Sequence, residues 1–167
     1  MKQLTPIPLT AESFKPFGDV IERDPKSKQS FNDGDAHRFH DLASVEAYDD
    51  PNSEGDGRAI ISIASSVPKS LPMELHKMER HPLGSQAFIP LSDAPFLVVI
   101  AADKDGSPDT PIAFITNGKQ GINYKAGTWH AVLTPLDKTS EFIVVDREGA
   151  GDNCEEIMLD HPFLITP

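Results

Sequence analysis

Short runs of β-branched and aromatic residues recur along the whole chain, with Asp, Gly, Pro and Asn between them at intervals of about ten residues. No stretch keeps an apolar spacing of helical period. The rhythm predicts a mainly β fold, a sandwich or barrel, rather than βαβ units with helical crossovers. The expected strands are 18–22, 59–65, 86–91, 96–102, 112–117, 121–127, 130–136 and 141–146.

One short helix is expected near the start. Thr10 can cap it, Glu12 and Ser13 fall in its first turn, and Pro16 and Gly18 end it. Residues 24–37 and 48–58, rich in Asp, Asn, Ser and Gly, are typical of surface loops. The role of the first loop stays open, because the following segment 38–43 adds Arg38 and His40.

Length and charge narrow the class of protein. A chain of 167 residues fits one domain, residues 1–167. The 26 acidic and 15 basic residues give a formal charge of −11, which repels phosphate backbones and anionic lipids, so neither nucleic acid nor membrane is expected as a partner. A single cysteine, Cys154, and an N-terminus without a signal-like apolar run favour the cytoplasm.

The first cluster of candidate chemistry, residues 76–91, contains His76, Glu79, Arg80, His81 and Gln86. In an extended segment residues two apart share a face, so Glu79 and His81 are expected to point the same way and Arg80 the opposite way. After a Pro-Leu-Gly turn the chain enters a strand at Gln86. A carboxylate, an imidazole and an amide can thus converge on one interior face.

The second cluster, residues 123–133, places Gly127 before Trp129 and His130. Together the two clusters have the spacing of the cupin barrel's two metal-binding motifs, with Glu79, His81, Gln86 and His130 at the ligand positions. Imidazole and carboxylate suit Ni, Mn, Fe or Zn, whereas a neutral amide such as Gln86 is a poor ligand. A divalent metal is therefore compatible with the pattern but not required by it; no organic cofactor is expected.

A third cluster, residues 144–156, begins within the last expected strand and continues beyond it. Asp146, Arg147, Asp152 and Asn153 can shape a barrel mouth or form a structural ion pair, and the structural interpretation is favoured because Asp, Asn and Gly gather in turns.

Several long segments of the sequence resemble the ureidoglycolate lyases of allantoin degradation. The segments that carry the resemblance are ELHKMERHPLGSQAFIPL, FITNGKQGINYKAGTWHAVL and VVDREGAGDNCEE, with FGDVIE and RFHDLA. The resemblance implies a cupin-like double-stranded β-helix barrel, a homodimer, cleavage of ureidoglycolate to glyoxylate and urea in purine catabolism, and a link to a metal, with nickel suggested.

For that reaction a base must remove the substrate's hydroxyl proton while urea departs. His81 or His130 can act as the base, or both can hold a metal that lowers the pKa of the hydroxyl. Glu79 would orient an imidazole or take the proton, and Gln86 can donate to a carbonyl. Ser85 and Cys154 need not be nucleophiles, because the alkoxide expels urea directly.

The substrate carboxylate requires a cation. Arg80, Arg38 and Lys125 are candidates. Arg80 is closest in sequence to the site but faces outward by strand alternation. Arg38 with His40 would have to come from the N-terminal loop, within the chain or across a dimer interface.

Two other function classes compete with the lyase. A cupin-like module that binds a small metabolite without catalysis would tolerate Glu79 and Gln86, which stand where the cupin motif has His and Glu, since a fold does not determine a function. A different metal-dependent cupin enzyme, an isomerase or dioxygenase, would be expected to keep intact His and Glu ligands.

Overall fold

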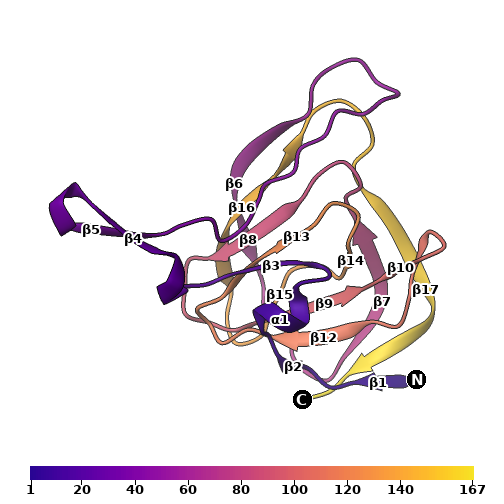
Figure 1. The fold of residues 1–167 in the computed structure, drawn as a ribbon. Helices are drawn as coiled ribbons and strands as arrows, with labels where there is room; N and C mark the ends of the chain where they lie inside the picture. Colours follow the sequence, from indigo (N-terminus) through magenta and orange to yellow (C-terminus); the bar gives the residue numbers. More distant parts are fainter.

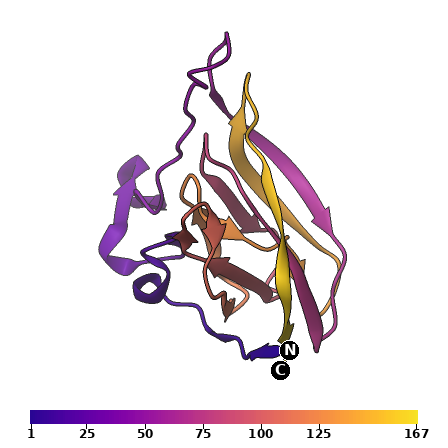
Figure 2. The same cartoon turned by 90° about the vertical axis from the view of Figure 1, so that its right-hand side faces the viewer.

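Two mainly antiparallel β-sheets face each other in the computed structural model, which describes residues 1–167 (Figure 1, Figure 2). The first has the order β1 (Lys2–Leu4), β17 (Glu155–Ile165), β7 (Met73–Arg80), β14 (Trp129–His130), β9 (Phe96–Ala101), β12 (Ile112–Ile115), β2 (Ile7–Pro8), with β15 (Thr134–Pro135) also on β9. The second has the order β3 (Gly18–Ile21), β13 (Gly121–Tyr124), β8 (Gln86–Pro90), β16 (Ser140–Glu148), β6 (Arg58–Ser66). The prediction of a mainly β fold is confirmed.

The core fills the space between the sheets. Phe96 of β9 meets Phe142 of β16 edge to face, with ring centroids 5.1 Å apart. Both faces of β9 are buried, because Phe96, Val98 and Ile100 face the second sheet while the alternate residues join a separate cluster behind β9. This explains why its sequence is a continuous apolar run.

The helix α1 (Ala11–Phe14) is the short N-terminal helix expected from the sequence. The hydroxyl of Thr10 accepts a hydrogen bond from the Ser13 amide at 3.1 Å, and Phe14 is fully buried. The two ends of the chain lie close together, because β1 pairs in parallel with the end of β17 (Figure 1).

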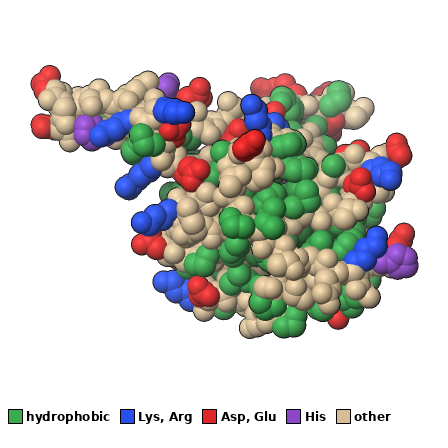
Figure 3. Space-filling model, turned by 60° about the horizontal axis from the view of Figure 1, so that its bottom comes forward, with side chains coloured by type: hydrophobic (Ala, Val, Ile, Leu, Met, Phe, Trp, Pro, Cys, Tyr) green, Lys and Arg blue, Asp and Glu red, His purple; other side chains and the backbone are tan.

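Part of the segment expected to be a surface loop is a hairpin arm. It consists of β4 (Lys28–Phe31) and β5 (Ala36–Phe39), with the short 3₁₀ turns η1 (Pro25–Ser27) and η2 (Asn32–Gly34). The arm projects from the body and carries charged and histidine side chains (Figure 3). A second small hairpin joins β10 (Asp103–Lys104) to β11 (Ser107–Pro108).

Candidate functional site

Glu79, His81 and His130 lie together at the inner side of the first sheet. Glu79 is on β7 and pairs in register with His130 on the adjacent strand β14, and His81 follows β7 directly. As alternation predicts, Glu79 and His81 share a face. One potential ligand atom from each of the three residues lies within 4.8 Å of the others, so the group can hold a metal ion.

Hydrogen bonds to the backbone determine which nitrogen of each imidazole carries the proton. Nδ1 of His81 lies 2.7 Å from the carbonyl oxygen of Asn153, and Nδ1 of His130 lies 3.1 Å from that of Ala131. Since a carbonyl only accepts, both Nδ1 atoms carry the hydrogen and both Nε2 atoms keep a lone pair. Neither Nε2 has a partner, although both are buried. The two rings are adjacent, with centroids 5.2 Å apart.

Burial keeps His130 neutral. It lowers the pKa of His130 from 6.5 to about 3, and the neighbouring His81 lowers it further, against the hydrogen bond to Ala131. Tyr124 stacks on the His130 ring at 4.3 Å and 4°, and burial raises the pKa of its hydroxyl. The two imidazoles beside the Glu79 carboxylate form a donor set suited to a cation, with each Nδ1 held by a backbone carbonyl as in metal-binding histidines.

A cavity of about 260 Å³ opens beside His81. In it the amide of Gln86 donates to Asp146 at 3.4 Å rather than pointing its NH₂ group at the open space. Burial raises the pKa of the Cys154 thiol, which keeps it protonated, and the Ser85 hydroxyl accepts the Glu46 amide at 2.8 Å. The lining residues are His81, Ser85, Gln86, Asp146, Arg147, Asp152, Asn153 and Cys154.

Two of the residues proposed to bind the substrate carboxylate, Arg80 and Lys125, are bound to other groups of the protein. Arg80 pairs with Glu155 and Asp103, both at 2.6 Å, and its guanidinium lies 4.5 Å above the Trp129 ring. Lys125 donates to the Lys15 carbonyl at 2.8 Å.

The other two candidates are on the arm. Arg38 donates to Gln29 across the hairpin at 3.1 Å, and the amide of His40 bonds to the carbonyl of Ser27. Neither lines the cavity beside His81, and the arm extends away from the body (Figure 1).

Tyr124 was not among the sequence candidates, and Asp146 and Asn153 belong to the third cluster, for which the sequence favoured a structural role. Asn153 fixes His81 with its carbonyl, and its side chain accepts the Leu83 amide at 2.7 Å. The alternation along the strand indicates that Asp146 shares a face with the inward-pointing Phe142 and Val144. Arg147, by contrast, is structural: its guanidinium binds the carbonyls of a neighbouring loop.

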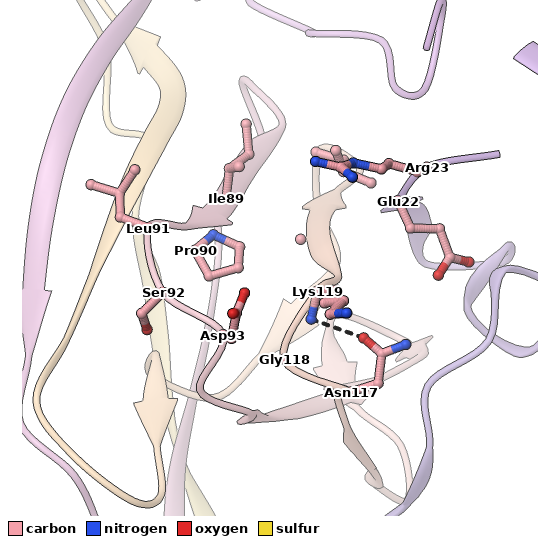
Figure 4. Close-up of a pocket in the computed structure, with 12 residues that line it drawn as sticks. Glu22, Arg23, Ile89, Pro90, Leu91, Ser92, Asp93, Asn117, Gly118 and Lys119 are labelled. Atoms are coloured by element: carbon pink, nitrogen blue, oxygen red, sulfur yellow. Dashed lines mark hydrogen bonds between the residues drawn. The ribbon is translucent and has the colours of Figure 1, made fainter. Parts of the chain in front are cut away.

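A larger cavity lies elsewhere. It measures about 780 Å³ and opens between the end of β3, the end of β8 with the loop 91–93 that follows it, and the loop 117–119 (Figure 4). Its charged residues have both signs, Arg23 and Lys119 together with Glu22 and Asp93, and no histidine lines it. It lacks a group that exchanges protons near neutral pH, so we place the reaction centre at the smaller cavity.

Residues 1–166 match the family model described as ureidoglycolate lyase. The chain belongs to the ureidoglycolate lyase family. A relative of that name from Chelativorans sp. (strain BNC1) is 46% identical over 165 residues, which cover 99% of this chain and 97% of the relative. Another, from Agrobacterium fabrum, is 48% identical over 160 residues, covering 95% and 93%.

Among solved structures, a dTDP sugar isomerase from Desulfovibrio desulfuricans G20 aligns with this ureidoglycolate lyase family member over 87% of each chain, at 13% identity and a TM-score of 0.44. No helix has the length and apolar character needed to cross a membrane.

Proposed function

We propose that the chain cleaves ureidoglycolate to glyoxylate and urea in the cavity beside His81. Membership of the ureidoglycolate lyase family supports the reaction. The observation that carries the choice of site is the pair of buried, unpartnered Nε2 lone pairs of His81 and His130, next to the Glu79 carboxylate.

The substrate carbon bears a hydroxyl, a carboxylate and a ureido nitrogen. When a base takes the hydroxyl proton, the alkoxide electrons form the carbonyl of glyoxylate and the C–N bond breaks. The leaving nitrogen then takes a proton and departs as urea, so the reaction neither consumes nor releases protons overall. No covalent bond to the protein is needed.

His81 is the better proton acceptor of the two histidines. Burial makes the imidazolium of His130 unfavourable, as its pKa of about 3 indicates. His81 borders the cavity and its Nε2 is free to accept. We assign His81 as the base that also returns the proton to the leaving nitrogen, and Glu79 as the carboxylate that stabilises its charged form.

A divalent metal fits the same residues. Glu79, His81 and His130 would hold it, in which case the histidines act as ligands and the hydroxyl itself becomes more acidic. Nickel, which the family resemblance suggests, is compatible with imidazole and carboxylate ligands. Gln86 lines the same cavity but is a poor ligand.

Three broader assignments accompany this function. We propose that residues 1–167 act as one domain in the cytoplasm, for which the free thiol of Cys154 is suitable. We also propose a homodimer. The arm supports it, because an isolated two-stranded hairpin is only marginally stable in water, and a partner could receive Arg38 and His40 at its substrate carboxylate.

The test is to incubate purified protein with racemic ureidoglycolate and quantify both products. Glyoxylate with an equal amount of urea supports the lyase, whereas glyoxylate with ammonia and CO₂ indicates an amidohydrolase. No turnover, with or without added Ni²⁺ or Mn²⁺, would favour a binding module.

The site is tested by substitution. His81→Gln and His130→Gln should each lower kcat by about a hundredfold or more. His76→Gln is the matched control and should retain activity, since His76 is half exposed and pairs with Glu74 outside the site. Metal analysis of the wild type and both variants then tells a base from a ligand.

A further inference from the structure

Gln86 and Asp146 lie side by side on β8 and β16, one step beyond the paired residues Ala87 and Val145. Both line the cavity beside His81, across from the sheet that carries Glu79 and His130.

The hydrogen bond between the two side chains leaves one buried acceptor atom of each without a donor. A carboxylate only accepts hydrogen bonds, so the NH₂ group of Gln86 must be the part that faces Asp146, with Nε2 3.4 Å from Oδ2. This leaves Oε1 of Gln86 and Oδ1 of Asp146, which are both buried and without a donor. Buried acceptors are normally satisfied, so the pair calls for a ligand with N–H or O–H groups.

A metal shared with the histidines does not account for the pair, because Asp146 is not in the group of ligand atoms that lie within 4.8 Å of one another. An anion is repelled by Asp146. A hydroxyl supplies one hydrogen. A ureido group supplies two parallel N–H bonds along one edge, which match two adjacent acceptors.

We propose that Gln86 and Asp146 form the subsite that binds the ureido N–H groups of the substrate, an inference that rests on the proposed lyase function. The subsite orients the substrate: the ureido end lies against β8 and β16, and the carboxylate points away from Asp146. The reacting carbon then faces His81. An analogue without these N–H groups is rejected, because it leaves both buried acceptors unpaired.

The experiment compares two dead-end inhibitors in wild type and Asp146→Asn. Ureidoacetate keeps the ureido group and the carboxylate but has no hydroxyl to deprotonate, and glycolate keeps the hydroxyl and the carboxylate but has no ureido group. In Asp146→Asn the inhibition constant of ureidoacetate should rise about ten- to a hundredfold, the effect expected for a lost charge-assisted hydrogen bond, while that of glycolate stays within about twofold.

A purely structural role for Asp146 would weaken both inhibitors equally. That result, no change in either constant, or a wild type that ureidoacetate does not inhibit would overturn the proposal. Gln86→Met keeps the side-chain length and removes Oε1. It should likewise raise the inhibition constant of ureidoacetate and leave that of glycolate unchanged, so it tests the subsite if Asp146→Asn does not fold. Glu141→Gln removes one charge from the exposed face of β16 and should change neither constant.

The proposed reaction is scored separately, by the wild type's yield of glyoxylate and urea. If the wild type makes neither product, the lyase function is wrong. If it makes both and the inhibitors fail to split, only the subsite is wrong.

Discussion

Replacing Arg80 with Met should destabilise the protein without impairing catalysis. The side chain is 19% exposed and makes two ion pairs, to Glu155 and Asp103. Because the partner carboxylates are about half exposed, solvent weakens each pair to about 0.5–1 kcal/mol. The guanidinium over Trp129 adds about 0.5–1 kcal/mol. Met keeps the packing over the indole, so the loss is about 2 kcal/mol in all.

That loss lowers Tm by about 4–8 °C in a domain of this size. Thermal unfolding and kcat/KM for ureidoglycolate are measured on the same preparations. Lys77→Met is the matched control: its ion pair with Glu156 lies on the same strand but is exposed, so Tm should not change. A drop in kcat/KM of more than tenfold at unchanged Tm would refute the reasoning and would indicate that Arg80 binds the substrate carboxylate.

Three other substitutions test the framework around the site. Asn153→Ala removes the acceptor for the Leu83 amide, so kcat should fall severalfold and the free energy of unfolding by about 1–2 kcal/mol; denaturant titration with unchanged values would contradict this. Phe142→Ala empties the fully buried contact between the sheets and should cost about 3–5 kcal/mol, measured in the same way; a cost below 1 kcal/mol would mean the core is not packed there. The hydrogen bond from the Trp129 indole lowers the pKa of Asp103 below 3.8. The ionised Asp103 carboxylate therefore makes its full contribution to the free energy of unfolding above pH 3.8, and this contribution is lost as pH falls through the lower pKa of the folded state. The Tm difference between wild type and Asp103→Asn should then shrink from pH 5 to pH 2, and a constant difference would argue against it.

Strands with a clear apolar pattern could be predicted from the sequence. The run 96–102 corresponds to β9 and 141–146 to the middle of β16. The longest strand, β17, was missed, because Asp160, His161 and Pro162 interrupt its apolar residues. In the structure the pairing register with β7 shifts between Met158 and Phe163, so the chain tolerates that interruption as an irregularity within one strand.

The candidate site was predictable in part. Alternation places Glu79 and His81 on one face, and the second motif supplies His130, because both inferences depend only on local geometry. The sequence places Asn153 and Asp146 at a possible barrel mouth but does not show that they meet His81 and Gln86. Asn153 reaches His81 from a turn 72 residues away, and only the long-range pairing of β16 with β8 brings Asp146 to Gln86.

The two halves of the proposed site belong to different sheets: the histidines and Glu79 to the first, Gln86 and Asp146 to the second. The distance between the reacting groups and the ureido subsite is therefore set by the thickness of the core, in which Phe96 and Phe142 act as spacers. A change in core volume would alter the length of substrate that fits, without touching any residue that contacts it. Substitutions in the hydrophobic core can therefore change the substrate selectivity of the protein.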